Sequence, residues 1–507
     1  MQLPTMGESL RLNARRFPEA IAVEDGSRVV SYRELNARVN RLAHGLRALG
    51  VGAGDVVGIL LENRLEHVEA IYAAAKLGAI AAPLDVKWGP TELDAMLRFF
   101  QPRALVLEAS LWDLAQSSEG TQGLPTVAVS DEAACPAGAT ADYAALLAEH
   151  PDAEPPLAAD EPDIFLLMLT SGTTGLPKAC IATHRMYALR CLNYSISEGV
   201  CHRDVFLLTM PLYFNAGRGA ALAHLFHGGK VVLLRGFDAA EALRTAERTR
   251  ATNLTLVATA ADRVLAAPEL AATDLSSLRF VRTTGSVLHR TTKEGILQKL
   301  TPHLHNAYGT TDTGAVCLLE PEDQLRKHGS VGRPIWGVEV RVVDDEGREV
   351  APGELGEVVV RGPLVCDGYY RNPEATAQAF REDGFHTGDL ARFDEDGYLY
   401  LLGRMKDMIK SGGISVYPEE IEELLNAHPA VLENAVIGVP DPQWGEAVHA
   451  FVVLQPGARL DEAEVIAHCR EHLAHYKAPK GVSFLPALPR TANGKIAKEQ
   501  LRTGGTA

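Results

Sequence analysis

Hydrophobic residues recur along the first hundred positions at two alternating spacings. Between Arg33 and Leu49 they return every three or four residues, which predicts a helix, whereas the short apolar run Val56–Leu61 predicts a buried strand. The alternation continues with helices predicted over Glu66–Leu77 and Pro90–Phe100, and with strands over Ala79–Pro83, Ala104–Leu107, Val205–Met210, Lys230–Leu234, Asn253–Val257 and Phe280–Thr283. Strands that alternate with helices indicate parallel sheets whose faces are covered.

The pattern changes from about residue 337. Short strands separated by Gly and Asp turns are predicted at Val338–Val343, Glu357–Arg361 and Tyr398–Leu402. Beyond Arg404, strands at Ala435–Val439 and His449–Leu454 and helices at Pro418–Ala427 and Asp461–Leu473 predict a small α+β domain. Residues 117–162, rich in Ala, Pro, Gly and acidic residues, are interpreted as a loosely structured connection.

These elements predict an α/β protein of two domains. The large N-terminal domain, residues 1–403, would hold parallel-rich sheets with packed helices and a β-rich subdomain. A hinge is placed at 404–406, and a small α+β domain at 407–507. A chain of 507 residues is too long for one compact core, which agrees with this division.

Composition narrows the class of protein. Hydrophobic residues make up 46% and charged residues 22%, as in ordinary globular proteins. The net charge of −16 argues against a general attraction to nucleic acid or to an anionic membrane, although a local basic site for phosphates remains compatible with it.

The cysteines and the apolar runs indicate a compartment. The seven cysteines are odd in number and form no CxxC pair, which argues against a disulfide framework and a structural zinc site and favours a reducing cytoplasm. The N-terminus is typical of an amphipathic helix rather than a signal peptide. The apolar stretch Ala70–Ala82 is interrupted by Lys76 and Gly78, so we expect no membrane span.

The sharpest local motif is Thr170–Lys178, with the sequence TSGTTGLPK. Its glycines let the backbone approach a ligand, its hydroxyls offer hydrogen bonds, and Lys178 adds a positive charge, which are the properties of a polyphosphate cradle. The apolar run Ile164–Leu169 would supply a supporting strand. The motif is not a Walker A loop, and taken alone it is equally compatible with a flexible Gly/Thr surface turn.

Six further segments decide between these interpretations. They are PLYFNAG at Pro211–Gly217, YGTTD at Tyr308–Asp312, GELG with GYYRNPEAT at Gly353–Gly356 and Gly368–Thr376, TGD at Thr387–Asp389, GRMKDMIKSGGISVYPEEIE at Gly403–Glu422 and PRTANGK at Pro489–Lys495. Together with the first motif, and in this order, they resemble the adenylate-forming superfamily of acyl-CoA synthetases, luciferases and peptide-synthetase adenylation domains. The resemblance covers nearly the whole chain and is strongest to free-standing acyl-CoA ligases.

The resemblance implies a two-step reaction. A carboxylic acid would attack the α-phosphate of ATP to give an acyl-AMP and diphosphate, and the acyl group would then pass to coenzyme A. Because two anions must meet in the first step, catalysis would depend on positioning and charge neutralisation, with Mg²⁺ as the expected metal.

The resemblance also assigns the ATP site. Lys178, Thr311 and Lys495 would be catalytic, with Thr311 on the α-phosphate and Lys495 reaching the carboxylate and the α-phosphate. The other ATP-binding residues would be Thr170, Ser171, Gly172, Thr173, Thr174 and Gly175 at the phosphates, Gly285, Ser286, Asn306, Ala307, Tyr308, Gly309 and Thr310 near the base, and Asp389 and Arg404 at the ribose. The alternatives are a core aromatic for Tyr308, a turn residue for Asp389 and a solvated tail lysine for Lys495.

Asp312 departs from the family pattern, which usually has Glu there as the Mg²⁺ ligand. Asp is also a hard oxygen ligand that suits Mg²⁺, but it is shorter by one methylene, so metal contact would run through water or need a small backbone shift. The alternative is a plain surface carboxylate.

The second half-reaction needs other groups beside the same acyl carbon. The resemblance implies that the small domain is mobile and rotates about Lys406 between the two steps. Ser411, Gly412 and Gly413 would then line a pantetheine passage, and Trp444, Tyr476, Lys480 and Lys87 are candidates for contacting coenzyme A. Exposed lysines and half-buried aromatics without such a role are commonplace.

The acyl pocket is expected at Tyr213, Phe214, Asn215, Gly217, Arg218, Thr284 and Gly314. Many relatives carry His where this chain has Phe214, so an apolar pocket wall is predicted instead of a polar gate. Arg218 would meet a second substrate carboxylate or, as such arginines do more often, form a structural ion pair. The identity of the acid stays open, and the sequence carries no signal for an oligomeric state.

Three classes of function remain. The leading one is a free-standing acyl-CoA ligase, and the second is an adenylation enzyme that loads the phosphopantetheine of a carrier protein. Because only a short segment follows Lys495, we expect no fused carrier, although a carrier acting in trans is compatible with the sequence. A non-catalytic nucleotide-binding protein is disfavoured because Lys178, Asp389, Arg404 and Lys495 are all present.

Overall fold

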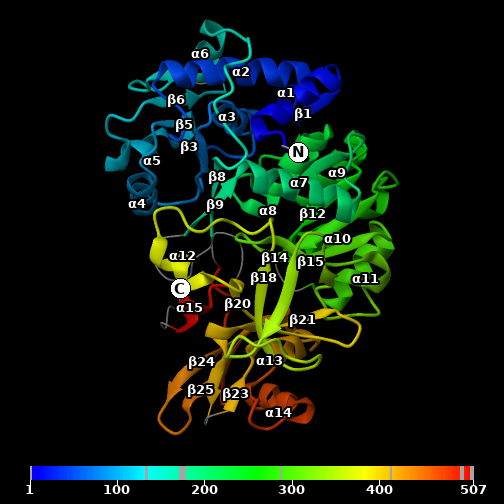
Figure 1. Cartoon of the computed structure of the whole chain (residues 1–507). Helices are drawn as coiled ribbons and strands as arrows, with labels where there is room; N and C mark the ends of the chain where they lie inside the picture. Colours follow the sequence, from blue (N-terminus) through cyan, green and yellow to red (C-terminus); the bar gives the residue numbers. More distant parts are fainter. Residues whose placement is uncertain are drawn as a thin grey trace. The chain divides into compact units, whose positions relative to one another are not determined.

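The computed structural model describes residues 3–131, 135–170, 178–285, 288–411, 414–490 and 496–502 (Figure 1). Contacts along the chain divide these residues into two compact units. The larger unit holds the described residues of 3–339 and 360–385, and the smaller unit holds those of 340–359 and 386–502.

A seven-stranded sheet forms the first half of the larger unit. In hydrogen-bonding order its strands are β7 (Ala141–Asp142), β6 (Thr126–Val129), β5 (Ala104–Glu108), β3 (Val56–Leu60), β4 (Ile80–Pro83), β8 (Ile164–Leu169) and β9 (Ala179–Thr183). All neighbours are parallel except β8 and β9, which form an antiparallel pair. The strands predicted between Val56 and Leu107 are therefore confirmed, within one or two residues at their ends.

A nine-stranded sheet forms the second half of the larger unit. Its strands, in order, are β16 (Arg333–Pro334), β15 (Gly314–Leu319), β14 (Leu304–Thr310), β13 (Phe280–Thr284), β12 (Asn253–Leu256), β10 (Val205–Leu208), β11 (Lys230–Leu233), β1 (Ile21–Asp25) and β2 (Arg28–Ser31). The run from β1 to β14 is parallel, and β2, β15 and β16 are antiparallel additions at the two edges.

Helices cover both sheets and fill the space between them. One core cluster joins residues of both sheets to the helices α1 (Met6–Arg16), α2 (Tyr32–Ala48), α3 (Leu65–Lys76), α6 (Tyr143–Glu149), α7 (His184–Glu198) and α8 (Asn215–His227). Outside this layer, α4 (Pro90–Phe100) and α5 (Trp112–Gln116) pack on the seven-stranded sheet. The nine-stranded sheet is covered on its outer face by α9 (Ala239–Thr249), α10 (Ala258–Ala266) and α11 (Arg290–Lys299).

One prediction about this unit is wrong. Residues 117–162 are not simply a loose connection, because they contain β6, β7 and α6. β6 extends the seven-stranded sheet beside β5, and Tyr143, Leu146 and Leu147 of α6 are buried in the central core. These elements are only two to seven residues long, so packing against the rest of the unit, rather than local periodicity, stabilises them.

The smaller unit is built from antiparallel pairs and a few helices. Its five-stranded sheet has the order β23 (Ile414–Val416), β22 (Ile409–Ser411), β25 (Gly445–Leu454) and β24 (Val431–Asp441), with β26 (Gly481–Phe484) parallel to β25. Its helices are α13 (Pro418–Asn426), α14 (Glu462–His472) and α15 (Lys498–Arg502). Most residues of a second sheet also belong to the smaller unit, although β19 belongs to the larger one. The strands of this sheet are β17 (Glu339–Val343), β18 (Gly356–Arg361), β20 (Gly384–Phe393), β19 (Phe380–Arg381) and β21 (Leu399–Arg404).

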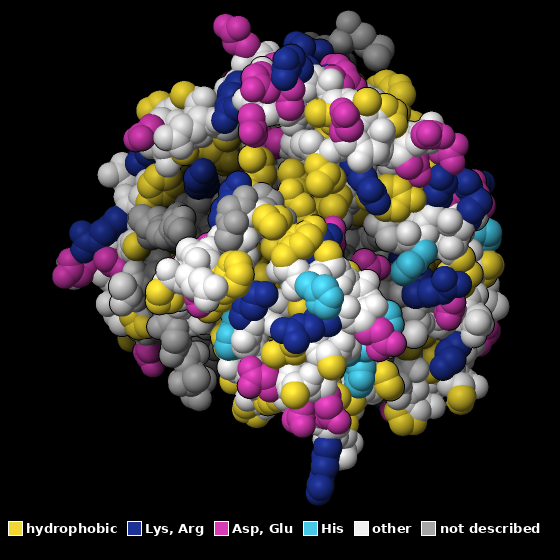
Figure 2. Space-filling view, turned by 90° about the horizontal axis from the view of Figure 1, so that it is seen from below, with side chains coloured by type: hydrophobic (Ala, Val, Ile, Leu, Met, Phe, Trp, Pro, Cys, Tyr) yellow, Lys and Arg dark blue, Asp and Glu magenta, His cyan; other side chains and the backbone are white. Residues whose placement is uncertain are grey.

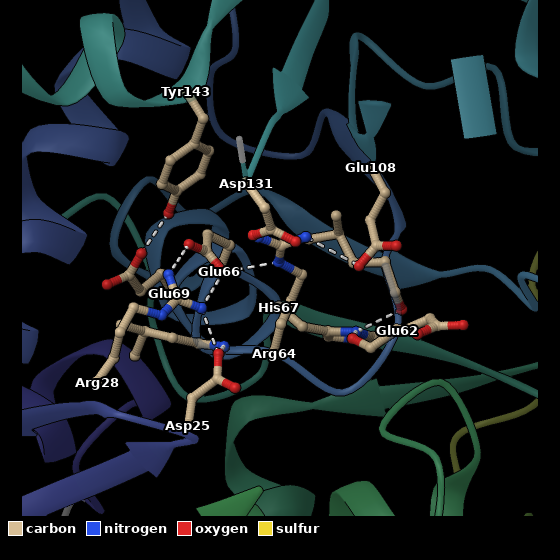
Figure 3. Close-up of polar contacts among 12 residues, drawn as sticks. Asp25, Arg28, Glu62, Arg64, Glu66, His67, Glu69, Glu108, Asp131 and Tyr143 are labelled. Carbon is tan, nitrogen blue, oxygen red and sulfur yellow. Dashed lines mark hydrogen bonds and ion pairs between the residues drawn. The ribbon is translucent and has the colours of Figure 1, made fainter. Parts of the chain in front are cut away.

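A buried ion-pair network connects the two large sheets (Figure 3). The Arg64 side chain is 2% exposed and donates to the carboxylates of Glu66, Glu108 and Asp131 at 2.7–3.0 Å. Arg28 of β2 bonds both Glu66 and Asp25. Because Asp25 and Arg28 belong to the nine-stranded sheet and Glu108 to the other, the network fixes the turn after β3 between them.

Two further observations concern the surface. Among the described residues of the face in Figure 2, Lys and Arg side chains are interspersed with acidic ones. Of the helices described, none is both long and apolar enough to cross a membrane.

Candidate active site

Several predicted site residues lie where parallel strands end. Thr170 follows β8, Tyr213 follows β10 within a few residues, and Thr284 and Thr310 are the last residues of β13 and β14. In open α/β sheets, ligands bind beyond the carboxyl ends of the strands. The fold therefore places these segments at the edge of the larger unit where a ligand is expected.

The structure describes the two ends of the predicted phosphate loop, Thr170 and Lys178. Leu169 and Ala179 pair in antiparallel register, and the amide of Thr170 donates to the carbonyl of Lys178 at 2.9 Å. Lys178 is exposed, and its ammonium stands 4.8 Å from the ring centroid of Tyr369. The predicted phosphate ligands Ser171, Gly172, Thr173, Thr174 and Gly175 lie outside the described residues.

The predicted adenine residues line the ends of β13 and β14. The Thr284 hydroxyl donates to the carbonyl of Ala307 at 3.0 Å, and the Thr283 hydroxyl donates to Asn306 Oδ1 at 3.2 Å. Tyr308 is 9% exposed. These contacts fix the two strand ends side by side, while Gly285 follows directly with φ +86° and Ser286 lies outside the described residues.

A tight turn joins β14 to β15 and carries Thr311 and Asp312. The hydroxyls and amides of Thr310 and Thr313 bond each other reciprocally at 3.0–3.2 Å, which closes the turn. A Cβ at Gly309 would overlap the carbonyl of Gly314, so only glycine fits there. Gly314 itself has φ +68°, which glycine adopts without strain.

Asp312 is buried and held by three donors. Its Oδ1 accepts hydrogen bonds from the Tyr369 hydroxyl at 2.7 Å and from the Cys180 thiol at 3.3 Å, and its Oδ2 accepts from Thr310 at 3.2 Å. Burial raises the pKa of Tyr369 and of Cys180, and the charge of Asp312 adds to both effects, so both stay protonated donors. The surface-carboxylate alternative for Asp312 therefore does not apply, since the residue is 7% exposed.

The surroundings of Asp312 fit a magnesium ion bound together with ATP. A carboxylate offers about four lone-pair positions, so three donors leave capacity for a metal. Mg²⁺ is commonly bound by one or two carboxylates plus substrate phosphates, rather than by a cage of protein ligands. No cluster of three or more His, Cys, Asp or Glu side chains suited to a metal occurs within the described part of the chain.

Arg190 of α7 holds this turn by hydrogen bonds, and the sequence analysis did not predict it as a site residue. Its guanidinium donates to the carbonyls of Asp312 at 2.8 Å, Leu364 at 2.8 Å and Thr311 at 3.3 Å. A Cβ at Gly314 would come within 2.9 Å of Arg190 Nε, which gives Gly314 a second requirement for glycine. No local pattern in the sequence identifies Arg190, because its partners lie more than 100 residues away.

The acyl-pocket loop, defined here as residues 210–214, is held by two side chains from outside it. Asn63, directly after β3, donates to Met210 O at 3.0 Å and accepts from the amide of Leu212 at 2.7 Å. Arg218 donates to the carbonyls of Leu212 at 3.1 Å and Tyr213 at 3.0 Å. The loop's conformation is thus fixed by Asn63, which the sequence did not reveal, and by Arg218, which was predicted to bind substrate or a carboxylate.

Among the described residues, the hydrogen bonds of Arg218 go to the carbonyls of Leu212 and Tyr213 and not to a carboxylate. Arg218 is 1% exposed, and burial lowers its pKa, an effect that the nearby Tyr187 partly opposes. Its hydrogen bonds go to backbone carbonyls, which accounts for part of the guanidinium's hydrogen-bonding capacity.

The walls of the acyl-pocket loop are aromatic. The rings of Tyr213 and Phe214 meet edge to face at 4.6 Å between centroids. Phe214 precedes α8, in which Asn215 is the first residue, and a Cβ at Gly217 would come within 2.7 Å of Pro211 O. The small residue at 217 therefore lets the helix start close against the loop.

In the smaller unit, Asp389 and Arg404 form a pair across β20 and β21. Arg404 Nε contacts Asp389 Oδ1 at 2.6 Å, and Arg404 Nη1 donates to the carbonyl of Thr387 at 3.0 Å. Asp389 is 6% exposed, whereas Arg404 is exposed. Lys406, two residues further, is exposed in the short 3-10 helix Met405–Asp407.

The predicted coenzyme A residues are only partly brought together. The Lys480 ammonium stands 5.3 Å from the Trp444 ring, and both belong to the smaller unit. Tyr476 is 41% exposed and pairs instead with Lys477, while Ser411 is buried at the end of β22. Lys87 is exposed in the larger unit. Gly412, Gly413 and the predicted catalytic Lys495 lie outside the described residues.

Two family descriptions match this chain. The AMP-binding enzyme family matches residues 10–370, and the AMP-binding enzyme C-terminal domain matches residues 420–495. Together they span most of the two units.

Proteins similar over their whole length agree with this match. A feruloyl-CoA synthase of Amycolatopsis sp is 37% identical over 492 residues, which is 96% of each chain. A 2-succinylbenzoate–CoA ligase of Geobacillus kaustophilus is 36% identical, covering 99% of this chain and 98% of its own. The crystal structure of ATP-bound MatB from Rhodopseudomonas palustris matches with a TM-score of 0.90 at 33% identity, covering 98% of both chains.

Proposed function

This chain belongs to the family of AMP-binding enzymes, and from that premise we propose how its residues perform the reaction of an AMP-forming acyl-CoA ligase. The enzyme joins a carboxylic acid to coenzyme A at the expense of ATP, through an acyl-AMP, and releases AMP and diphosphate. The resemblance stated from the sequence motifs and the α/β fold class are both confirmed.

In our proposal the larger unit performs the phosphate chemistry of the first step. Lys178 neutralises the β- and γ-phosphates, and Thr311 contacts the α-phosphate. Asp312 would hold the Mg²⁺, which would supply positive charge to the phosphates. Tyr308 lies against adenine, and Asp389 with Arg404 binds the ribose. The observation that supports this most directly is the buried Asp312 carboxylate, joined through Tyr369 to the exposed Lys178.

The second step in this proposal uses the smaller domain, residues 407–507, after rotation about a hinge at 404–406. Lys406 is an exposed polar residue, as a hinge that must stay solvated requires. Ser411, Gly412 and Gly413 admit pantetheine, and Lys480 with Trp444 contacts the coenzyme A end.

We propose an acid with an apolar, aromatic body. The support is the edge-to-face pair of Tyr213 and Phe214 at the predicted pocket wall. Arg218 uses hydrogen bonds on the carbonyls of the same wall, which favours a positioning role over capture of a second carboxylate. Feruloyl-CoA synthase is named for an aromatic acid with one carboxylate, which agrees with this choice. The acid that names 2-succinylbenzoate–CoA ligase is also aromatic but carries two carboxylates.

A ligation screen tests the function. Purified enzyme with ATP, Mg²⁺ and coenzyme A is given short, medium, aromatic and dicarboxylic acids, and AMP and the thioester are measured by chromatography. We expect thioester with aromatic acids at a catalytic efficiency at least about tenfold above that for dicarboxylic acids. If no acid yields AMP, the assignment of the reaction fails, and if dicarboxylic acids are preferred, only the proposed acid class fails.

The acceptor is tested in the same assay. Replacing coenzyme A by the phosphopantetheine arm of a carrier protein distinguishes the ligase from a carrier-loading enzyme. We expect coenzyme A to be the better acceptor, as the names of the compared ligases indicate.

We also propose a reducing, cytoplasmic setting for the protein. The support is that all seven cysteines are present as free thiols.

A further inference from the structure

Tyr369 touches two residues of the proposed ATP site with one side chain. Its hydroxyl donates to Asp312 Oδ1 at 2.7 Å, and the face of its ring lies 4.8 Å from the Lys178 ammonium. The two partners are 134 positions apart in the chain, so neither sequence motif contains the link between them. Tyr369 is 7% exposed, whereas Lys178 is exposed.

The position of Tyr369 is itself fixed by the strand that leaves the phosphate loop. Residues 368–370 run beside β9, with Ile181 donating to Gly368 O at 2.9 Å and Tyr370 donating to Ala179 O at 2.8 Å. Tyr369 pairs with Cys180 in a β-bridge. A movement of the strand after the phosphate loop therefore carries the Tyr369 ring with it.

The contacts on both sides suit a positioning role. A hydrogen bond to a charged carboxylate is stronger than one between neutral groups and fixes the rotamer of the acid. A cation over an aromatic face is attracted by the ring quadrupole, which limits where the flexible Lys178 side chain points. Thr310 and Cys180 also donate hydrogen bonds to Asp312. Among the described residues, however, the side chain seen to contact both Asp312 and Lys178 is that of Tyr369.

We propose that Tyr369 is a positioning residue that orients the metal carboxylate of Asp312 and the phosphate-binding ammonium of Lys178 together. The proposal rests on the proposed function for the roles of those two residues. Tyr369 acts through both partners and touches neither substrate nor metal. A purely structural tyrosine, in contrast, would affect stability without changing how metal and nucleotide binding depend on each other.

The test measures ATP binding by calorimetry without any acid, once with saturating Mg²⁺ and once with a chelator. Tyr369→Phe keeps the ring under Lys178 and removes the hydroxyl. It is expected to weaken binding of Mg-ATP about tenfold, as for a lost hydrogen bond to a charged group, and to leave metal-free ATP binding unchanged. Tyr369→Leu removes the ring as well and is expected to weaken binding in both conditions.

Two comparisons make the result specific. In an Asp312→Asn background, Tyr369→Phe is expected to cause less than about a twofold further loss, because the hydroxyl acts through the carboxylate. Tyr370→Phe is the matched control, because Tyr370 is the neighbouring residue and its ring packs on Phe99 and Phe100 instead. This variant is expected to change neither the Mg-ATP affinity nor the metal-free ATP affinity. Thermal denaturation of each variant shows whether it is folded.

Equal Mg-ATP affinity in the wild type and Tyr369→Phe overturns the proposal, as does a full additive loss in the Asp312→Asn background. If Tyr369→Phe does not fold, Tyr369→Leu, which also lacks the hydroxyl, replaces it, and a loss of affinity that is equal with and without Mg²⁺ in that variant overturns the proposal too. Because binding is measured without turnover, failure of the acyl-CoA ligase assignment appears separately, as absence of AMP from the wild type.

Discussion

At the scale of single residues, the structure shows which side chains hold Asp312, which is one methylene shorter than the usual glutamate. The short side chain is met from inside the protein by the Tyr369 hydroxyl and the Cys180 thiol. A buried aspartate with hydrogen-bond donors on both oxygens is held in one direction, which would offset its shorter reach in the proposed metal site.

This leads to the first prediction. Asp312→Ala removes the proposed metal ligand and is expected to lower acid-dependent pyrophosphate exchange by about 100-fold or more, the size typical of losing one electrostatic stabiliser. Asp312→Glu keeps the hard oxygens and is expected to retain most of the activity. Equal exchange rates in the wild type and in both variants would exclude a metal role for this position.

Which site residues the sequence predicts depends on how their partners are arranged in the chain. Thr170, Lys178, Tyr308 and Thr311 stand in contiguous motifs whose composition already indicates phosphate and nucleotide chemistry. Tyr369 was within a recognised segment but carried no assigned role, because its partners come from other motifs. Such long-range contacts leave no periodic signal in the sequence.

At the scale of elements, the acyl-pocket loop shows how a short segment is held by distant side chains. Between Met210 and Tyr213, Asn63 and Arg218 together bond three carbonyls and one amide. A loop without such partners would leave buried backbone groups unsatisfied, and each of these costs free energy. The Tyr213 and Phe214 rings therefore inherit their position from residues outside the loop.

The second prediction concerns this loop. Asn63→Ala is expected to raise the KM for the acid found in the ligation screen about tenfold, from the loss of hydrogen bonds to buried backbone groups. The KM for ATP is expected to change less than about twofold. Asn36→Ala is a suitable control, since Asn36 contacts the side chains of Glu154 and Lys76 instead. A parallel rise in both KM values would contradict a specific role in the acyl pocket.

The turn that carries Asn63 is fixed in turn by the ion-pair network around Arg64. Burial opposes the ionisation of Glu66, but the hydrogen bond from Arg28 and the charge of Arg64 outweigh it and lower the pKa of Glu66 to about 2. A lowered pKa in the folded state means that the carboxylate stabilises the fold above its ordinary pKa of 4.5. This contribution is lost as the pH falls from about 4.5 towards 2.

The third prediction follows from that sign. Glu66→Gln removes the carboxylate that Arg64 and Arg28 share, while Arg64 keeps Glu108 and Arg28 keeps Asp25. It is expected to lower the free energy of unfolding by about 2 kcal/mol at pH 7, as for lost hydrogen bonds to charged groups. The difference from the wild type is expected to shrink below pH 4.5, where Glu66 of the unfolded wild-type chain takes up a proton while the folded protein keeps the carboxylate ionised down to about pH 2. Urea unfolding at pH 7 and at pH 3 measures both values, and a pH-independent difference would contradict the ionic origin.

Helices and strands were predicted well where they are long and their faces are regular. α4 and β8 have the predicted bounds, because Pro90 starts the first and the apolar run Ile164–Leu169 forms the second. β6, β7 and α6 were missed because each is too short for a periodic pattern, and burial against the central core stabilises them. Local pattern thus identifies elements that are long enough to show a regular periodicity, although these elements too depend on tertiary packing for their stability.

At the scale of the whole molecule, the two steps of the reaction need different groups beside the same carbon atom. The first step needs a positive charge beside the carboxylate and the α-phosphate, whereas the second needs room for a thiol at the same carbon. One arrangement of side chains does not meet both needs, so the proposed rotation of the smaller domain about 404–406 exchanges them. Asp389 pairs with Arg404, the first residue of that proposed hinge, on adjacent strands of one sheet.

The fourth prediction tests this exchange through Lys495, whose proposed role belongs to the first step alone. Lys495→Ala is expected to lower acyl-AMP formation by about 100-fold or more, because a lysine that neutralises charge in the transition state is lost. Thioester formation from added acyl-AMP is expected to stay within about twofold of the wild type, since the thiol step would use the rotated arrangement. Both half-reactions are measured separately on the same preparation, with Lys299→Ala, an exposed lysine of α11, as the control. Comparable losses in both half-reactions would show that Lys495 is needed in both steps. That result would contradict the proposed rotation of the smaller domain between them.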